Sequence, residues 1–446
     1  MTDNGNRKRP VRTLEVENFS VIKKAKLEFG RITVLVGPQA SGKSLLCKLA
    51  YFLGWEVANI AARSLVDRRS WGEFLGTVNL EFVSRFSIAG WLRADTRASF
   101  SSHQYSVSVS GVSDPLDVHI EFAFSNGFRK LYESSVQALL TQATLSAPAQ
   151  AQLHQDLWVE ISHLIDPVRS QPNIYVPSGR QLFTAASRFV AALDSPGLDE
   201  ITRHFAGLIA WDPRWKVGMV TSGRGVTQGV EQEMNRIARG AVVMTGGEPA
   251  FLSSDGRRLP LSMLSSGTAE ILPVLQVLNY LAYSQEHLNM LVASRSQSSA
   301  NGFRESSPLI YLEEPEASVF PETQRELVNL FAWMANDPIL SFDWVITTHS
   351  PYILTAFNTL IEAWRAAKKT GRRDEVAAIV PEHSWISEDD FAAYTIQENV
   401  LKPIFEKEAK GIEGSGLIDG DYLDDVSDTI SNQFARLLEI EFADAT

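Results

Sequence analysis

Residues 35–46, LVGPQASGKSLL, place glycines, a lysine and a serine at a spacing that suits phosphate binding. Between an apolar run and a helix-like run, the pattern G-x-x-x-x-G-K-[ST] is met by Gly37, Gly42, Lys43 and Ser44. In such a loop, backbone N–H groups hold phosphate oxygens, the lysine reaches the β- and γ-phosphates, and the serine hydroxyl ligates Mg²⁺. We therefore predict ATP and Mg²⁺ as cofactors, and we expect ATP to contact Gly37, Pro38, Gln39, Ala40, Ser41, Gly42, Lys43, Ser44 and Leu45.

Two carboxylates, Glu313 and Glu314, follow the apolar run LIYL. Hydrolysis at a phosphate-binding loop needs an acid that holds the metal and a group that positions water. Acids at the carboxyl end of a parallel strand, where loops gather, are well placed for both tasks. We expect Glu313 to face Mg²⁺ together with Ser44, directly or through water, and Glu314 to be the catalytic base. A solvated strand end is the alternative.

The turn formed by Ser265, Ser266 and Gly267 precedes another helix-like run and forms a second candidate anion site. One chain cannot readily bring both anion sites onto the same γ-phosphate. We therefore expect this turn to contact the nucleotide bound by another subunit. The alternative is an ordinary helix cap.

His349 lies near the end of the strand-like segment DWVITTHS. In isolation, a histidine is more often a structural residue than a catalytic one. Its place, one strand and one helix after the two acids, instead predicts a catalytic role in which it senses the γ-phosphate.

The surrounding pattern predicts the elements that position these residues. Residues 11–36 alternate in short β-rich pieces and end in an apolar strand, and residues 44–62 repeat apolar side chains at helical spacing. The region 78–124 returns to β-like alternation and predicts an antiparallel sheet beside the nucleotide site. A mostly helical region follows at 130–238, then a hairpin at 240–264, a helix at 268–283 and short strands at 308–314 and 343–350. Since no heptad pattern persists, a long coiled coil is not expected.

Arg180 ends the extended piece NIYVPSGR inside the helical region. A turn made of proline, serine and glycine precedes it. One interpretation is that Arg180 approaches phosphate or a neighbouring subunit. The other is that it is a solvated arginine in a surface turn.

Composition limits the possible classes. The chain has 446 residues, of which 44% are hydrophobic and 21% charged, as in soluble globular proteins. No run approaches eighteen apolar residues and no apolar leader follows the polar start, so we expect a cytoplasmic protein without a membrane partner. The single cysteine, Cys47, fits a reducing compartment and is expected to be buried in a helix.

The net charge of −12 argues against overall nucleic-acid binding, but basic stretches at 6–12, 63–69 and 365–373 leave local DNA binding open.

The order of the motifs resembles that of the ABC-type ATPases, in the soluble branch that includes SMC, RecF and OLD proteins. GPQASGKS, LSSGT, LEEPEAS and TTHS follow one another as Walker A, signature, Walker B and switch-histidine motifs do, and LEVENFSVIKKAKLEF is similar to that branch's first hairpin. The resemblance covers residues 11–355 around a variable insert. It implies an α/β fold: an ABC-type P-loop ATPase head with a mixed central sheet, an antiparallel β subdomain and a mostly helical insert. It also implies slow, oligomer-dependent hydrolysis of ATP to ADP and phosphate, and places the D-loop at 317–320.

The chain departs from the family pattern in three places. Glu313 stands where an aspartate is usual, so its metal contact is altered or water-mediated. PEASVFP replaces the frequent PEAHLHP, which affects the D-loop contacts between subunits. The Q-loop glutamine has no clear counterpart; Gln104 and Gln137 are candidates, and neither is counted as a site residue.

Within the branch, the chain looks most like stand-alone AAA-family ATPases of bacterial anti-phage defence, by GPQASGKS, YVPSGR and residues 416–441. The resemblance implies a homo-oligomer held by ATP-site contacts that controls a separate effector protein, a Toprim-type nuclease, with a phage trigger protein as a further candidate partner. Because the residues after His349 do not place a Glu and an Asp-x-Asp on successive predicted strands, we expect the nuclease to be a separate chain. The alternatives are a RecF-like DNA-repair ATPase that binds duplex DNA and a non-hydrolysing ATP-bound scaffold.

We expect four regions along the chain. An N-terminal ATPase lobe with Walker A and the β subdomain covers 1–129, and the helical insert covers 130–238. A C-terminal ATPase lobe with signature, Walker B and switch histidine covers 239–360. The tail, 361–446, is expected to serve partner or oligomer contacts.

Overall fold

The computed structural model describes residues 11–113, 118–140, 146–165, 173–184, 200–211, 226–245, 248–295, 308–405, 417, 418 and 433. Parts of the expected insert at 130–238, residues 296–307 and most of the tail beyond 405 lie outside these residues. The same holds for most of residues 416–441, which carry part of the resemblance to the defence ATPases.

One mixed sheet of eleven strands organises the described residues. Its order is β6 (Val118–Phe124), β5 (Tyr105–Ser113), β4 (Arg97–Ser102), β1 (Thr13–Phe19), β2 (Ile22–Glu28), β14 (Val400–Pro403), β13 (Phe391–Gln397), β3 (Ile32–Val36), β12 (Asp343–Thr348), β11 (Leu309–Glu313) and β7 (Ile174–Val176). Strands β13, β3, β12, β11 and β7 run parallel, whereas β6, β5, β4, β1 and β2 form an antiparallel half. Strand β14 joins the halves, pairing with β13 and β2.

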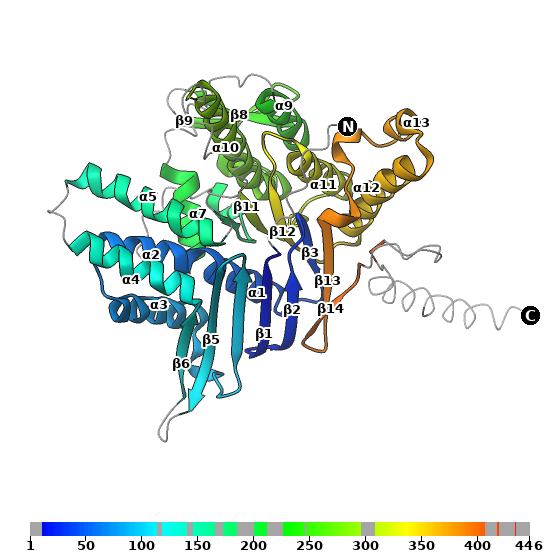
Figure 1. Ribbon diagram of the computed structural model, residues 1–446. Helices are drawn as coiled ribbons and strands as arrows, with labels where there is room; N and C mark the ends of the chain where they lie inside the picture. The colour runs from blue at the N-terminus through cyan, green and yellow to red at the C-terminus, as the bar shows by residue number, and fades with distance from the viewer. Residues whose placement is uncertain are drawn as a thin grey trace, which may run out of the picture.

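The helices pack around this sheet in two groups (Figure 1). The group near the antiparallel half contains α2 (Val57–Val66), α3 (Trp71–Phe86), α4 (Asn126–Leu140) and α5 (Ala147–Ile165). The group near the parallel half contains α9 (Val226–Ala238), α10 (Ser266–Arg295), α11 (Pro321–Asn336) and α12 (Pro351–Thr370). Other described elements are α1 (Lys43–Tyr51), a π-helical turn (Phe52–Glu56), α7 (Glu200–Trp211), α13 (Arg373–Ala377) and a small sheet of β8 (Gly240–Thr245), β9 (Glu248–Ser253) and β10 (Arg258–Pro260). The predicted α/β class, with a helical portion and without a long coiled coil among the described residues, is confirmed.

The register of the parallel strands brings the expected site residues to one edge of the sheet. Val36 pairs with Thr348 across β3 and β12, and Glu313 pairs with Thr347 across β11 and β12. All residues of these three strands are buried, as expected for a sheet covered on both faces. The segments that leave the carboxyl ends of β3, β11 and β12 therefore begin side by side.

Alternate residues of the parallel strands enter two different hydrophobic cores. In β11, Leu309 and Tyr311 belong to the core shared with α1–α5, whereas Ile310 and Leu312 belong to the core shared with α9–α12. This alternation follows from the two-residue period of a strand. The sheet is thus the middle layer between two helical layers, and the edge that carries the site residues packs against a hydrophobic core on each face.

The β-like alternation expected from residue 78 is wrong for residues 78–86, which lie in α3. Ser70 and Glu73 form a capping box at the helix start. The buried residues Phe74, Val78 and Phe82 then recur every four positions, which suits a helix. The predicted antiparallel strands are present from residue 97 onward.

The structure differs from the expected division at residue 360, which falls inside α12. Residues of the expected tail form β13 and β14, and β13 pairs in parallel with β3, with Tyr394 beside Leu35. Without β13, the backbone of β3 would be unpaired on one side. These tail residues therefore complete the ATPase sheet.

Residues Lys43–Val66 are long and apolar enough, by length and composition, to be compared with a membrane span. They include α1 and α2, and 78% of the tested window is buried inside the protein. A segment buried to this extent inside the protein is typical of a helix in the protein core. Cys47 is buried in α1, as predicted, and burial raises the pKa of its thiol.

Candidate active site

The phosphate-binding loop joins β3 to α1, in the strand-loop-helix arrangement that the sequence predicted. Gly37 has a φ of 148°, and Gly42 has a φ of 103° and precedes the first residue of α1. A side chain at Gly42 would meet this left-handed backbone and place its Cβ 2.5 Å from Cδ1 of Ile22 in β2. Glycine at this position lets the helix start tightly against β2, with the free N–H groups of its first turn at the loop.

Lys43 turns its side chain back onto the loop. Its Nζ donates hydrogen bonds to the carbonyl oxygens of Gly37 at 2.7 Å and Pro38 at 2.8 Å, and it lies 3.4 Å from Nδ1 of His349. Burial lowers the pKa of Lys43, while nearby carboxylates, Glu314 foremost, oppose this shift. A triphosphate would offer this ammonium group charged acceptors in place of neutral carbonyl oxygens, and such hydrogen bonds are stronger.

Glu314 has a φ of 41°, a conformation that residues other than glycine rarely adopt. Its backbone N–H donates to the carbonyl oxygen of Thr347 at 2.9 Å. Its Oε1 lies 3.0 Å from Nε2 of His349, and the two side chains are 35% and 27% exposed, respectively. Strained backbone of this kind costs about 1–3 kcal/mol and is common at functional sites. The imidazole therefore lies between a carboxylate held by a strained backbone and the ammonium of Lys43.

Glu313 is buried, and both of its carboxylate oxygens accept hydrogen bonds. Oε1 accepts from the Tyr175 hydroxyl at 2.6 Å, and Oε2 accepts from the backbone N–H of Ser178 at 3.1 Å. Each oxygen keeps a further lone pair. The donors fit Mg²⁺ held by Ser44 and, through water, by Glu313, because protein-bound Mg²⁺ usually keeps several waters beside phosphate oxygens. Among the described residues, no three His, Cys, Asp or Glu side chains form a metal cage of their own.

Glu316 is a site residue that the sequence pattern did not identify. Its Oε1 accepts from the backbone N–H of His349 at 2.5 Å and from the Thr348 hydroxyl at 2.8 Å. Its Oε2 is buried without a hydrogen-bond partner, and burial raises the pKa of Glu316. Glu316 therefore fixes the end of β12 against the segment that follows β11. The only signal in the sequence is a third acid in LEEPEAS.

The turn at Ser265–Gly267 opens α10, where the sequence placed a helix start. Ser265 caps the helix, since its Oγ accepts from the backbone N–H of Thr268 at 3.3 Å. Ser265 and Ser266 are exposed, while Gly267 packs so closely that an added Cβ would lie 2.7 Å from the carbonyl oxygen of Ser318. Ser265 is therefore the cap of α10, and this cap leaves other backbone N–H groups of the first helical turn open to a ligand.

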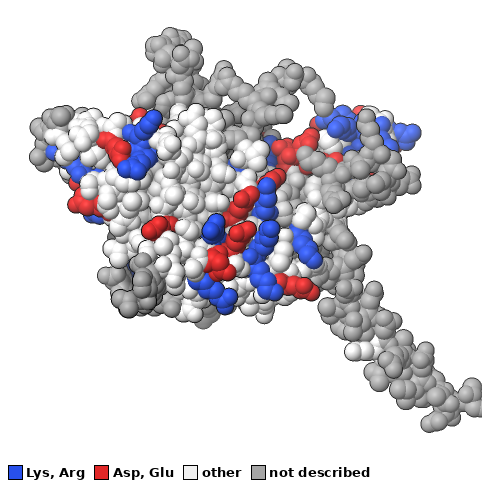
Figure 2. All heavy atoms as spheres, turned by 60° about the horizontal axis from the view of Figure 1, so that its bottom comes forward, with Lys and Arg blue, Asp and Glu red and all other residues white. Residues whose placement is uncertain are grey.

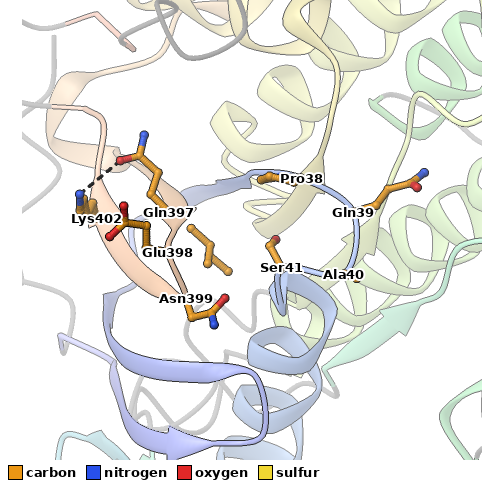
Figure 3. Close-up of a pocket in the computed structure, with 9 residues that line it drawn as sticks. Pro38, Gln39, Ala40, Ser41, Gln397, Glu398, Asn399 and Lys402 are labelled. Atoms are coloured by element: carbon orange, nitrogen blue, oxygen red, sulfur yellow. Dashed lines mark hydrogen bonds between the residues drawn. The ribbon is translucent and has the colours of Figure 1, made fainter. Parts of the chain in front are cut away.

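The loop and the turn line two separate recesses. The first has a volume of about 500 Å³ and lies between residues 38–41 and the β13–β14 hairpin, residues 396–402. Figure 3 shows the hairpin and the loop facing each other across this space, with Gln39 pointing away from it. The second has a volume of about 520 Å³ and is lined by residues from 179–182 and 261–269, including Ser266. These recesses share no lining residue.

Arg180 is not a solvated surface residue, so that interpretation is wrong. Its side chain is fully buried, and its guanidinium donates to the carbonyl oxygens of Glu313 at 2.5 Å and Glu314 at 2.9 Å. It also forms an ion pair of 3.3 Å with Glu270 in α10. The sequence could not show this, because Glu270 lies 90 positions further along the chain.

Many cations of the basic stretches pair with acids instead of forming open patches. Arg12 pairs with Asp343 at 2.7 Å and is buried, and Arg63 lies 3.3 Å from Glu81. Arg365 contacts two carboxylates at 2.8 Å each. On the face in Figure 2, basic and acidic residues lie next to one another in the centre and at the left, and much of the described surface carries neither. This face offers no uniformly positive surface for a nucleic-acid backbone.

Comparisons with known proteins agree with an ATPase. Residues 110–354, more than half of the chain, match the AAA ATPase domain family. No curated protein matches the sequence.

Solved structures similar to the chain include an SMC head bound to the C-winged helix domain of ScpA, with 10% identity, coverage of 88% of this chain and 96% of that chain, and a TM-score of 0.38. The SMC head domain from Thermotoga maritima has 10% identity, coverage of 88% and 98%, and a TM-score of 0.35. The ATP-binding cassette of an ABC transporter in its ADP conformation has 11% identity, coverage of 88% and 89%, and a TM-score of 0.31. The matched residues include Glu313, Glu314 and His349. Because the match covers more than half of the chain, the chain belongs to the AAA ATPase domain family.

Proposed function

We propose that this protein is an ABC-type switch subunit that binds and hydrolyses ATP at sites shared between two subunits. The observation that carries the proposal is the contact chain from Lys43 through His349 to Glu314, at 3.4 Å and 3.0 Å. It places a phosphate-binding cation, an imidazole and a carboxylate together at one edge of the sheet. This is the set of groups that phosphate binding and water activation require.

The catalytic roles follow from the positions of these side chains. Lys43 binds the β- and γ-phosphates, and Glu314 accepts a proton from the attacking water. His349 contacts both, so a γ-phosphate that enters beside Lys43 also meets the imidazole. Bound Mg²⁺, held by Ser44 and through water by Glu313, would offset the negative charge of the phosphates.

The nucleoside extends from the loop toward the β13–β14 hairpin. Glu314 and His349 belong to the β11 and β12 side of β3, and they mark the γ-phosphate end of the site. The recess of about 500 Å³ lies on the β13 side. Gln397 and Asn399 line it, and their amides can both donate to and accept from the polar edge of a base.

Exposed apolar side chains near the motifs support a homo-oligomer. Met263 precedes the signature turn and is 74% exposed, Phe320 ends the D-loop segment and is 75% exposed, and Tyr352 follows His349 and is 54% exposed. Large exposed apolar side chains next to site motifs are typical of interaction surfaces. Together with the separate recess at Ser266, they support a partner subunit that brings its signature turn to the γ-phosphate bound at Lys43.

The ATPase is proposed to control a separate effector in anti-phage defence in the cytoplasm. The support is the motif resemblance to AriA, the ATPase of the PARIS system, which acts with a Toprim-containing nuclease. In this proposal, ATP-dependent assembly holds or releases the nuclease, and a phage protein is the trigger. The neighbouring basic and acidic residues of Figure 2 do not favour the alternative of a duplex DNA clamp.

The test has a biochemical and a cellular part. Purified protein should hydrolyse ATP and form a homo-oligomer, and Glu314→Gln should keep ATP bound in that oligomer. Co-expression with a nuclease from a neighbouring gene should cause toxicity or phage protection that depends on Lys43 and Glu314. An effect that persists in both Lys43→Ala and Glu314→Gln would reject the switch, and DNA binding that weakens steeply with salt would favour DNA repair.

A further inference from the structure

Arg180 joins two motifs that lie on different elements. It follows β7, and its Nη1 donates to the carbonyl oxygens of Pro177 at 2.8 Å and Glu313 at 2.5 Å. Its Nη2 donates to the carbonyl oxygen of Glu314 at 2.9 Å. The last two acceptors belong to the backbone of the Walker B acids. One guanidinium therefore supports the strained peptide that carries the proposed catalytic base.

The other side of Arg180 contacts the signature helix. Its Nε donates to the carbonyl oxygen of Glu270 at 3.2 Å, and its Nη2 lies 3.3 Å from the Glu270 carboxylate. That carboxylate also accepts from the backbone N–H groups of Arg180 and Gln181, each at 3.0 Å. Glu270 is buried and lies one helical turn after Ser266. The start of α10 is thus tied to the loop that carries Arg180.

A second contact joins the same two regions. Gly267 packs against the carbonyl oxygen of Ser318, which lies in the segment after Glu314. Because buried, hydrogen-bonded groups deform little, a displacement of the first turn of α10 has to move the backbone at Glu314 or break these contacts. A buried ion pair such as Arg180–Glu270 is weak support for stability as such, since desolvating both charges is costly. A role in positioning the backbone at Glu314 accounts for the presence of this ion pair.

We infer that Arg180 is a positioning residue that couples the two ATP sites of an assembled pair. The signature turn of one subunit contacts the γ-phosphate bound by its partner, and Arg180 transmits that contact to Glu314 of the same subunit. ATP in one site thereby aligns the base in the other site, and the pair hydrolyses in concert. This inference rests on the proposed function, because it needs a signature turn that acts across subunits.

The test compares pairs with one and with two working sites. Mixed pairs of one Lys43→Ala subunit and one intact subunit are purified through two tags and verified by native mass spectrometry. They contain one nucleotide at ATP concentrations that fill the intact site and leave the Lys43→Ala site empty. If the two sites were independent, such a pair would hydrolyse ATP at half the rate of the two-site pair. We expect the rate to lie below that half by several-fold, within the range of about 5- to 150-fold typical of coupling between sites. The same two pairs are then compared with Arg180→Lys in every subunit. In this variant the one-site pair should turn over at about half the rate of the two-site pair, because the lysine lacks the planar group that bridges both motifs.

A matched control is Arg12→Lys, which changes another buried arginine, paired with Asp343 at 2.7 Å. It should keep the wild-type ratio of one-site to two-site rates, although it alters another buried ion pair. If Arg180→Lys does not fold, Glu270→Gln breaks the same link from the helix and should show the same ratio of one half. Thermal unfolding of each variant separates loss of coupling from loss of structure.

The outcomes distinguish this inference from the proposed function. A wild-type one-site pair that turns over at half the two-site rate overturns the coupling and leaves shared-site hydrolysis intact. An Arg180→Lys ratio equal to that of wild type overturns the role of Arg180. Absence of ATP turnover in the two-site pair overturns the proposed function, and the coupling with it.

Discussion

Nε2 of His349 lies 3.0 Å from Oε1 of Glu314, although these residues follow different strands, β12 and β11. The contact exists because the two strands pair in parallel and in register. The imidazole gives the Glu314 carboxylate a partner on the side where Lys43 donates hydrogen bonds to the carbonyl oxygens of the loop. Variants at these residues and their neighbours test whether this arrangement binds and hydrolyses ATP.

Lys43→Ala should weaken ATP binding about 10- to 100-fold, since hydrogen bonds to charged groups contribute roughly 1.5–3 kcal/mol each. Titration calorimetry with ATP and Mg²⁺ measures the effect. Lys48→Ala, which changes a lysine later in the same helix, is the control and should bind as wild type. Equal affinities of wild type and Lys43→Ala would refute the phosphate-binding loop.

Glu314→Gln should leave ATP affinity within a few-fold of wild type and slow hydrolysis about 10²- to 10⁴-fold, because the amide keeps the shape of the side chain and cannot accept the proton. Phosphate release at saturating ATP measures the loss. Glu322→Gln, an exposed acid at the start of α11, serves as control. Turnover near the wild-type rate would show that another group is the base.

Ser266→Arg should bind ATP and fail to hydrolyse it, because the added bulk and charge lie where a partner's γ-phosphate must approach. Mixing it with Lys43→Ala protein should restore about one working site per mixed pair, and that site should turn over at the rate of the one-site pair of a Lys43→Ala subunit with an intact subunit. Ser134→Arg, at an exposed position of α4, should be active alone. No recovery in verified mixed pairs would contradict catalysis between subunits.

Glu316→Gln should change how stability depends on pH. Burial raises the pKa of Glu316 above its ordinary value of 4.5, so the folded protein binds this proton more tightly than the unfolded chain. That contribution to stability is present below 4.5 and is lost as the pH rises through the folded-state pKa. Glutamine resembles the protonated acid and keeps the acceptor for His349. Urea unfolding from pH 4.5 to 8 should therefore show the variant gaining stability relative to wild type as the pH rises; a constant difference would contradict the shift.

Gly42→Ala should lower the free energy of unfolding by about 1–3 kcal/mol and weaken ATP binding, because φ at this position is 103° and Ile22 is close. Gly76→Ala, in the interior of α3 with open space around it, is the control. It should be neutral or stabilising by up to about 1 kcal/mol. Urea unfolding of both variants decides the matter, and equal stabilities would contradict the backbone requirement.

The chemistry-bearing motifs could be predicted from the sequence because each is local. The loop between Gly37 and Ser44 needs only its own residues, an apolar strand before it and a helix after it. The apolar runs at 309–313 and 343–348 identified buried parallel strands, since both faces of such strands are covered. Parallel strands carry their following loops at one edge, so the sequence was enough to assign Glu313, Glu314 and His349 to a common place.

Other features depend on contacts between residues far apart in the chain, and only the tertiary structure decided them. Helix α3 is an exception, because its capping box and the four-residue spacing of Phe74, Val78 and Phe82 are local signals that the predicted β-like alternation overlooked. The pairing of β13 with β3 joins residues 391–395 to residues 32–36, and no local pattern encodes that choice. Arg180 has the sequence context of a surface turn, yet it is buried because Glu270 and the carbonyl groups after β11 satisfy its charge and its hydrogen bonds.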